Sequence, residues 1–527
     1  MKTLVFRLVA PTLLLGAALA ARAQSPYVGE SLNYARLQFG GPARTQGIAG
    51  ANVALGADFG NLSSNPAGLG LFQKSEIHFS PGVGIGSAEA TGLTAQKNSF
   101  HVGSIGGVFT NRRADDDNTS DWRGGSFAIG FARVADFNTT FQYAGTVADN
   151  RSFFQYLREP GRNAFGTAGY QGSISGIDTQ YNNGTNPVYT NVDGLAYGAF
   201  LSDIRSTRIR PSRPVAFDSI ITLARTGPIT QAETVTTSGS VSQLDFGYGG
   251  SFKDRLFVGG AVGIVSSNRR QVRSFGEADA GGRSFVVNDE TRTTGTGFNA
   301  RIGAIYRLNN AVRLGASVQT PTFLQLDDTY NTSITSTFSP PLALTSPTGT
   351  TLMPGTTVKT PPGEYAYALT TPFRANGGVA FTAGKLGFLT ADVEYVGYGQ
   401  ARLSSQPNNA NGDNNSFSRE NQGIQNAFRS TVNVRLGAEA RLDVFRLRGG
   451  YAHYGDPNAG NAGPDRSQQF YTVGLGLRQN NFFLDVAGVY TAYKQLYAPY
   501  ALVSGQEPQV NIANTRYTTT VTAGFTF

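Results

Sequence analysis

Apolar and polar residues alternate with a period of two along much of the chain. From Arg516 to Phe527 one parity carries Tyr517, Val521 and Phe525, while the other carries mostly Thr and Gly. The same pattern recurs in 301–307, 389–395 and 432–441. A strand with one apolar and one polar face fits a barrel wall between lipid and a polar lumen. The pattern therefore predicts an all-β chain, and a soluble β-sandwich with one wet face is the alternative.

The connections between these segments favour a transmembrane antiparallel β-barrel. Tight turns at 253–254, 308–310 and 383–385 alternate with long polar loops such as 328–362 and 404–425. Outer-membrane barrels have short periplasmic turns and long outer loops. We expect about 14 strands, an even number as bacterial barrels require, near 75–86, 98–110, 123–146, 239–253, 255–268, 293–307, 311–327, 364–382, 386–403, 426–441, 444–454, 467–479, 481–494 and 512–527.

Two parts of this barrel are unusual. The segment 123–146 is either one long strand or two strands with a break near Asp136. A long insert at about 147–237 carries apolar residues spaced by three and four, which predicts short amphipathic helices outside the membrane. We expect these helices either to line an apolar groove that captures a ligand or to pack together as a lid. The candidate capture residues are Phe153, Phe154, Tyr197, Phe200, Leu201 and Ile204.

The first residues read as a secretory signal peptide at 1–23. Lys2 and Arg7 precede the apolar stretch 8–20, and Ala21-Arg22-Ala23 is a small-x-small cleavage site. The formal net charge of +8 falls to about +5 without this segment. That excess is small and scattered, so we expect no nucleic-acid partner. The chain has no Cys, which excludes disulfides and thiolate chemistry.

Residues 24–74 do not alternate and are rich in Gly and Ala. Between a signal peptide and a run of strands, such a segment suits a hatch, a compact plug inside the barrel lumen. Asn65 can cap a helical turn whose first residue is Pro66. The candidate gate residues are Asn65, Pro66, Ala67 and Gly68, and the alternative is that they only set a turn.

Charged residues at lumen-facing positions of the predicted strands are candidates for bracing the wall and the hatch. Glu394 and Arg435 lie on successive strands and are expected to pair. An apolar solute would offer such groups little to contact, so bracing is favoured over ligand binding. The set is Arg301, Arg307, Asp392, Glu394, Arg435, Glu439 and Arg441.

Several segments resemble one family. Residues 40–51 with 65–69 are similar to the hatch of the outer-membrane long-chain fatty acid and hydrocarbon transporters (FadL/TodX-like), and 303–315, 369–374 and 392–396 resemble the Bacteroidetes-type branch. The resemblance implies a fourteen-stranded barrel in the outer membrane of a Gram-negative bacterium. It also implies an apolar solute captured at outer loops, gated by the hatch and released sideways through a kink in the strand 123–146.

From this resemblance we expect a monomer surrounded by outer-membrane lipid and lipopolysaccharide, with no cofactor, no metal and no enzymatic activity. Two alternatives remain: a non-transporting scaffold or secretion-machinery partner, and a haem receptor that uses His78 and His101. The run 115–117 is a solvated acidic turn rather than a calcium loop, because the spaced ligands of such a loop are missing.

Overall fold

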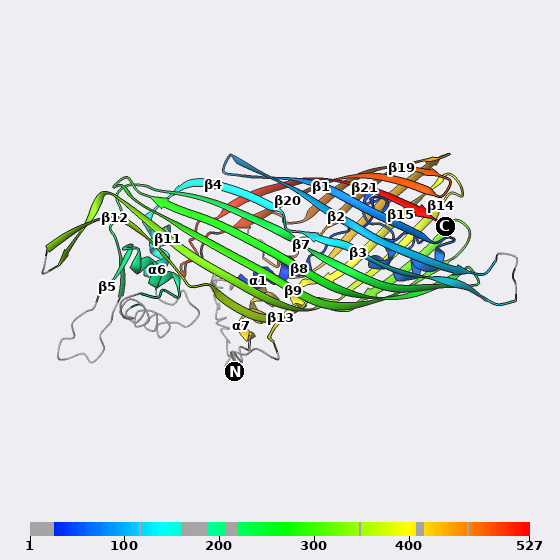
Figure 1. Cartoon of the computed structure of the whole chain (residues 1–527), viewed down its shortest axis with the longest axis horizontal. Helices are drawn as coiled ribbons and strands as arrows, with labels where there is room; N and C mark the ends of the chain where they lie inside the picture. Colours follow the sequence, from blue (N-terminus) through cyan, green and yellow to red (C-terminus); the bar gives the residue numbers. More distant parts are fainter. Residues whose placement is uncertain are drawn as a thin grey trace, which may run out of the picture.

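The wall of the molecule is one antiparallel sheet that closes on itself. The structure, a computed structural model, describes residues 26–114, 117, 119–159, 177, 187–205, 219–346, 349–406, 416–460 and 463–527. The wall has 14 strands, and it is closed because the last strand, β21 (Val510–Thr526), pairs with the first, β1 (Glu76–Ala90). Figure 1 shows long tilted strands with the C-terminus at the end opposite the long loops. The fold class expected from the sequence is confirmed, while the signal peptide lies outside the described residues.

Four wall strands are interrupted and are therefore built from two segments each. They are β3 (Trp122–Asp136) with β4 (Thr139–Val147), β10 (Val312–Gln319) with β11 (Phe323–Ser346), β13 (Gly363–Thr370) with β14 (Arg374–Thr382), and β15 (Gly387–Gly397) with β16 (Arg402–Ser405). The continuous strands are β1, β2 (Leu93–Arg112), β7 (Ile229–Phe252), β8 (Leu256–Ala278), β9 (Arg283–Arg307), β17 (Ser430–Leu442), β18 (Phe445–Tyr454), β19 (Gln468–Gln479), β20 (Phe482–Tyr497) and β21.

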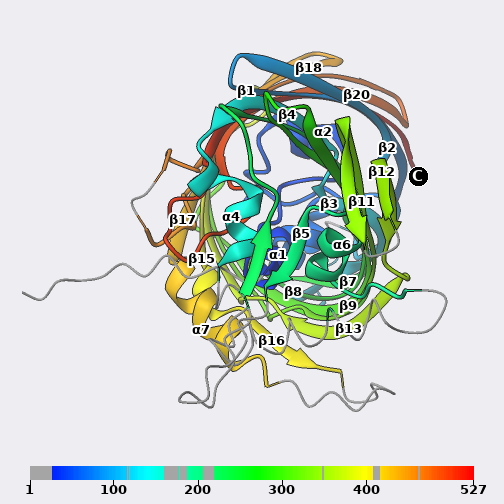
Figure 2. The same ribbon diagram turned by 90° about the vertical axis from the view of Figure 1, so that its left-hand side faces the viewer.

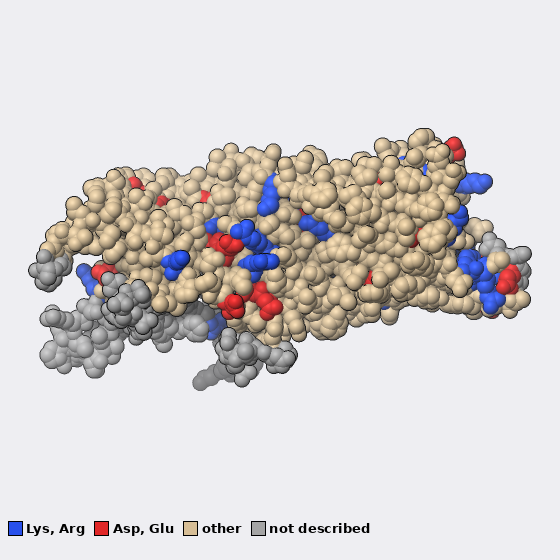
Figure 3. Space-filling model, viewed as in Figure 1, with Lys and Arg blue, Asp and Glu red and all other residues tan. Residues whose placement is uncertain are grey.

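Alternation along the strands separates an outer apolar face from an inner polar one, as the sequence predicts. On β21 the outward Tyr517 is 61% exposed, whereas the inward Thr520 and Thr522 are fully buried. On the face shown in Figure 3, few charged residues lie between the middle of the barrel and the turns at the right-hand end. An apolar outer belt above short turns is the arrangement of a barrel that crosses a membrane.

Several strands extend further outward than the sequence suggested, and two predicted loops are wrong. Strands β8 and β9 run through the expected loop 269–292 and join at 279–282, while β11 and β12 (Gly349–Lys359) form a hairpin within the expected loop 328–362. In these extensions the outer face is no longer apolar, and the inner face mixes charged residues with apolar ones such as Phe275 and Phe285, so the period of two disappears from the hydropathy. The Thr-rich sequence still favours strand there, because β-branched residues fit a pleated sheet.

The insert between β4 and β7 ends earlier than predicted, because β7 begins at Ile229 rather than near 239. The helices α4 (Phe153–Arg158) and α6 (Val192–Gly198) occur where apolar spacing predicted helix. The apolar Ile220 and Ile221 of the insert belong to a strand, β6 (Ser219–Thr222), which pairs with β5 (Ser202–Arg205). A further helix, α7 (Ser418–Ala427), lies in the connection before β17. Short 3-10 turns are η2 (Asp149–Arg151) and η3 (Tyr398–Gln400).

The N-terminal segment lies inside the ring of strands (Figure 2). It consists of α1 (Pro26–Ala35), α2 (Ala43–Gly47), α3 (Asn61–Ser64) and the 3-10 helix η1 (Pro66–Leu71), followed directly by β1. Most of its residues from 41 to 72 are buried. None of the helices in the described ranges is long and apolar enough to span a membrane. The segment is thus placed as the hatch hypothesis requires, within the lumen and in contact with the wall.

Candidate functional site

Asn65 joins the hatch to the wall at the predicted gate residues. Its side chain accepts a hydrogen bond from Ala67 N at 3.2 Å, which caps η1 as expected. Its Nδ2 donates to Val53 O at 2.7 Å within the hatch and to Ala304 O at 3.2 Å on β9. One buried amide therefore fixes the turn, a second hatch segment and the wall. Only glycine at position 303 leaves room for it, because a Cβ there would overlap Asn65 Oδ1.

Pro66 and Gly68 pack in equally restricted space. The carbonyl of Pro66 faces Gly259 on β8, where a Cβ would overlap it. A Cβ on Gly68 itself would come within 2.5 Å of the Asn61 side chain. Asn65, Pro66 and Ala67 are thus in close contact with the wall, whereas Gly68 packs against Asn61 within the hatch, so each position allows little extra volume.

Three of the predicted bracing residues contact the hatch directly. Arg301 lies 2.9 Å from Asp245 on β7 and donates to Leu62 O in α3 at 3.2 Å. The Asp392 carboxylate accepts from Val53 N at 2.9 Å. The Glu439 carboxylate lies 3.9 Å from the guanidinium of Arg44, which belongs to α2. These contacts come from β9, β15 and β17, so the hatch is held from several sides of the lumen.

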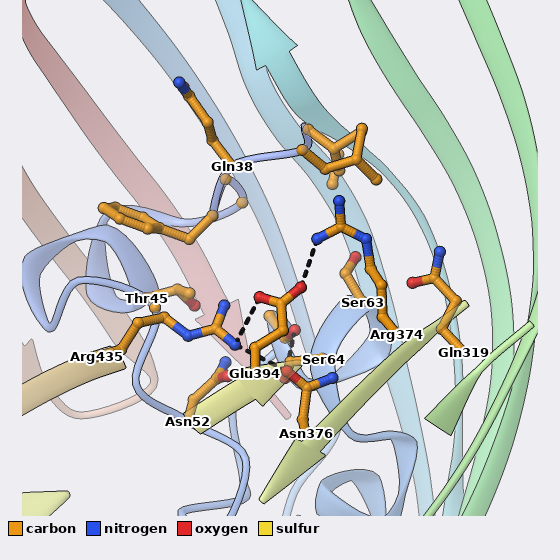
Figure 4. Close-up of a pocket in the computed structure, with 18 of the residues that line it drawn as sticks. Gln38, Thr45, Asn52, Ser63, Ser64, Gln319, Arg374, Asn376, Glu394 and Arg435 are labelled. Atoms are coloured by element: carbon orange, nitrogen blue, oxygen red, sulfur yellow. Dashed lines mark hydrogen bonds and ion pairs between the residues drawn. The ribbon is translucent and has the colours of Figure 1, made fainter. Parts of the chain in front are cut away.

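Glu394 lies at the centre of a buried charge cluster beside the hatch. It points between two arginines, Arg374 and Arg435, at the side of a cavity of about 80 Å³ (Figure 4). Arg435 lies 3.1 Å from Glu394, so the expected pair is present, and it also donates to Asn376 Oδ1 at 2.8 Å. Arg374 pairs with the other carboxylate oxygen and donates to Ala35 O at the end of α1. It is Arg374, not Arg435, that connects this cluster to the hatch backbone.

The two remaining bracing candidates lie apart from the hatch contacts. The guanidinium of Arg307 is 5.5 Å from the ring of Phe257. Arg441 is one-third exposed and pairs with Glu439 at 2.9 Å. Glu439 is bound more tightly by Arg448, at 2.7 Å and almost fully buried. Sequence parity placed Arg307 and Arg441 in the lumen correctly but could not show which lumen charges reach the hatch.

A buried apolar cluster, called the chamber below and filled by α1, surrounds this helix further toward the outer end, and sequence reasoning did not find it. Its walls come from seven strands and from α7, and α1 contributes Val28, Tyr34 and Ala35. The wall residues include Val241, Val265, Leu324, Leu326, Tyr367, Leu369, Val396, Leu403, Phe417, Ile424 and Phe428. Each strand adds only one or two of them, so no local pattern in the sequence marks the chamber.

One carboxylate from α1 is held at the side of this chamber. Glu30 lies 3.3 Å from Arg269 on β8 and accepts from the Tyr367 hydroxyl at 2.7 Å. These partners are separated from Glu30 by hundreds of positions along the chain. Burial of an unpaired carboxylate among apolar groups is costly, so Arg269 and Tyr367 are needed for α1 to rest there.

The wall beside the chamber is broken between β3 and β4. Both segments pair with β7. The pairing of β3 with β2 runs from Gly124 opposite Arg112 to Ala132 opposite Ser104 and ends there, so the residues of β2 before Ser104 have no partner on β3. Gly239 of β7, with φ +116, accepts from Phe137 N at the break. This confirms the interpretation of 123–146 as two strands with a break near Asp136.

The break is fixed by the ion pairs of Asp136 and by the hatch. Asp136 pairs with Arg516 on β21 and lies 3.2 Å from Arg133. Gln38 N of the hatch donates to Val134 O at 2.8 Å, and the rings of Tyr34 and Phe137 are 5.9 Å apart in an edge-to-face contact. The hatch, the chamber and the broken strand are therefore in direct contact.

The six predicted capture residues lie at the outer mouth of the barrel, in two apolar clusters. Phe153, Phe154 and Leu201 are buried against Phe275 and Phe285 of the extended strands, with Phe200 at the edge of this cluster. The other two, Tyr197 and Ile204, pack against Ile177 and Ile220. In this structure they cover the mouth as a lid would, and a role in ligand capture stays a prediction.

A buried arginine anchors the insert to the barrel rim. Arg225 lies 3.4 Å from Glu277 and 3.5 Å from Asp279, and its guanidinium is 4.3 Å from the ring of Phe154. Burial lowers the pKa of Arg225 from its usual range. The cost of desolvating this cation is offset by two carboxylates and an aromatic face.

The histidines that suggested a haem site do not face one another. His78 pairs with Gly106 in the β1–β2 ladder and His101 with Gly82, so they are separated by several residues along the strands. His78 is within 3.1 Å of Ser104 and packs on the ring of Phe59. Within the described residues no group of three His, Cys, Asp or Glu side chains could hold a metal ion. Asp115 and Asp116 lie outside the described residues.

Comparison with known proteins places the fold. No protein-family model and no curated protein matches the chain. A FadL homologue of Pseudomonas aeruginosa is 11% identical and aligns over 93% of this chain and 98% of that chain with a TM-score of 0.51.

Two toluene transporters align over the same share of the chain. TbuX of Ralstonia pickettii is 14% identical over 93% of this chain and 99% of that chain, with a TM-score of 0.49. TodX of Pseudomonas putida is 12% identical over 93% and 100%, with a TM-score of 0.48. The chain thus has the fold of the FadL homologue, a closed antiparallel barrel of 14 strands whose N-terminal segment occupies the lumen.

Proposed function

We propose that the protein is an outer-membrane channel for hydrophobic small molecules such as long-chain fatty acids or hydrocarbons. The observation that carries this proposal is the apolar chamber in the lumen, which is filled by α1 and borders a break in the barrel wall. A hydrophobic solute gains free energy by entering such a chamber, and the broken strand gives it a way out beside the membrane.

Capture begins at the outer mouth in this proposal. The two apolar clusters of the insert supply exchangeable hydrophobic contacts, with Phe200 and Tyr197 only half-buried. A solute that separates the insert from the rim reaches the lumen, where it competes with α1 for the chamber walls. Because apolar contacts are non-directional, this step favours hydrophobicity over a particular shape.

Gating by the hatch follows from what lies below the chamber. The hatch fills the lumen toward the periplasmic turns with small buried residues tied to the wall by Asn65, Arg301 and Asp392. A direct path from the chamber through the hatch to the periplasmic end of the lumen requires all of these contacts to break together. Release through the break at Phe137 and Asn138 requires only local movement, and the solute then enters an apolar phase rather than water.

A single chain suffices for this path. The barrel closes through the pairing of β1 with β21 and leaves no open edge in the wall at that seam. We therefore propose a monomer in the outer membrane, in contact with its lipid and lipopolysaccharide.

The test is uptake of a fluorescent long-chain fatty acid by cells that express the chain. Leu326→Asp places a charge in the chamber, where Leu326 is fully buried, and should abolish uptake. The matched control is Leu352→Asp, because Leu352 is 64% exposed. Both variants must first show the heat-dependent gel shift of a folded barrel.

Lipid extraction of the purified protein gives an independent result. A co-purified fatty acid or hydrocarbon supports transport. Uptake no greater than in cells without the protein, together with a stably bound protein partner, would reject the channel and support the scaffold alternative.

A further inference from the structure

Three polar cavities lie along the hatch, between the break in the wall and the periplasmic turns. The first, of about 30 Å³, is beside Asp136 and Arg516 at the break. The middle cavity, of about 80 Å³, borders the Glu394 cluster. The third, of about 120 Å³, reaches Asn480 and Asn481 in the turn between β19 and β20. Since about 15 Å³ of such space suffices for one water molecule, each cavity is large enough to be hydrated.

Two buried side chains indicate that these cavities suit water. Asn52 of the hatch is 1% exposed and lines the middle cavity near Glu394 and Arg435 (Figure 4). Neither its amide oxygen nor its amide nitrogen has a hydrogen-bond partner among the described residues. His78 is 5% exposed and lines the periplasmic cavity, and its Nδ1 has no partner within the same part of the chain. Buried polar groups of this kind are satisfied by ordered water rather than by an apolar solute.

Successive cavities meet at residues that they share. Gln38 lines both the first and the middle cavity, and Phe59 lines both the middle and the periplasmic cavity. Gln38 is only half-buried, and its amide can exchange hydrogen bonds with water. Phe59 is apolar and 2% exposed, so water gains no hydrogen bond from its side chain. The Phe59 ring is therefore the apolar divider in an otherwise polar series.

The wall leaves a place for this ring. Gly106 on β2 and Gly130 on β3 are opposite each other in the ladder, and a Cβ on either would come within 2.5 Å of the ring. Gly106 is also opposite His78 on β1, so the two glycines lie at inner-face positions where the wall contributes no side chain. The ring of Phe59 contacts the imidazole of His78, with the ring centroids 4.4 Å apart. Removal of the ring would leave this place unfilled and join the two cavities.

We propose that the Phe59 ring seals a polar route for water and small ions through the lumen, separate from the path of the hydrophobic solute. An apolar constriction in a narrow polar passage excludes water, and ions do not cross where water is excluded. A solute on a direct path has to break the contacts of Asn65, Arg301 and Asp392 with their partners, whereas this route opens when one ring moves. The seal concerns the hatch in its docked position and does not rest on which solute the channel carries.

The test is the conductance of the purified protein in planar lipid bilayers in concentrated KCl. Phe59→Ala should raise the conductance about tenfold or more over wild type, because the water-excluding ring is lost. The matched control is Phe72→Ala. Phe72 is 5% exposed and belongs to the same apolar cluster of the hatch, but it lines neither cavity. This variant removes the same atoms from the same cluster and should conduct as wild type does.

Two results would overturn the seal. One is a folded Phe59→Ala variant that conducts no more than wild type, and the other is a Phe72→Ala variant that conducts as much as Phe59→Ala, which would indicate general loosening of the hatch. Phe59→Leu guards against a misfolded alanine variant. Its smaller apolar side chain should give an intermediate conductance, so a leucine variant that conducts as wild type also counts against the seal. Fatty-acid uptake by these variants is expected to be unchanged, because the proposed exit at the break does not pass Phe59, and this separates failure of the seal from failure of the channel.

Discussion

Replacement of Glu30 by Leu should increase the affinity of the chamber for hydrophobic ligands. In the proposed function a ligand must displace α1, so its apparent affinity is lowered by the stability of the docked helix. Glu30 contributes to that stability through Arg269 at 3.3 Å and Tyr367 at 2.7 Å, in a site where the side chains of Glu30 and Arg269 are only 15% and 12% exposed.

The size of the effect follows from these two contacts. Net loss of one hydrogen bond to a charged group is worth about 1.5–3 kcal/mol, which corresponds to about a 10- to 150-fold change in ligand affinity. The gain should be largest for a ligand with a carboxylate, because Glu30→Leu leaves Arg269 without its partner and a fatty acid can replace it. A hydrocarbon of the same length cannot, and it must enter beside a largely buried cation that has lost its carboxylate partner and keeps Gln271.

The affinities of the fatty acid and of the hydrocarbon can be compared by measuring how each displaces a fluorescent fatty acid from the purified protein. The control is Glu364→Leu, the same change at an exposed outer position of β13. If Glu30→Leu leaves both affinities unchanged, α1 does not compete with ligand and the proposed chamber is wrong. If the affinities for the fatty acid and for the hydrocarbon rise equally, α1 still competes with the ligand, but the proposed role of Arg269 in binding the carboxylate is wrong.

Three further outcomes are expected. Deletion of residues 24–70 should give a barrel that still inserts but admits small polar dyes into liposomes, and a tight deletion variant would place the plug elsewhere. Arg435→Ala should raise dye leakage only slightly, because Glu394 keeps Arg374; a leak as large as that of the deletion would show that Arg435 itself holds the hatch. Asp136→Ala leaves Arg133 and Arg516 facing without their shared anion, so amide exchange at 136–142 should quicken, and unchanged exchange would contradict a locking role.

The lipid-facing part of the barrel was predictable because it obeys one local rule. Tyr517 and Thr522 differ in parity, and parity decides which one meets lipid. The outer extensions of β8 and β9 were not predicted, because the parity rule applies only where one face of a strand contacts the apolar part of the membrane. Between 269 and 292 the outer face is no longer apolar, and the inner face mixes charged residues with Phe275 and Phe285, which pack against the insert, so hydropathy no longer alternates while the backbone still pairs.

The hatch contacts were partly predictable for a different reason. A cap at Asn65 is a property of adjacent residues, so Asn65-Pro66 suffices to predict it. The partner of its Nδ2, Ala304 O, depends on how the hatch sits in the closed barrel and leaves no local signal. The same holds for Arg374, whose segment 369–374 was noticed only for its resemblance, and for the pair of Glu30 with Arg269.

The position of the extended segment between α1 and α2 connects these observations. Its Gln38 is hydrogen-bonded to Val134 just before the break, and Gly40 lies so close to Arg133 O that a Cβ there would overlap it. When α1 leaves the chamber, the residues that follow it must also move, and they are the ones that support the kinked end of β3. In the proposed channel, displacement of α1 by a ligand would therefore act on the broken strand through direct backbone contact, which would couple filling of the chamber to loosening of its exit.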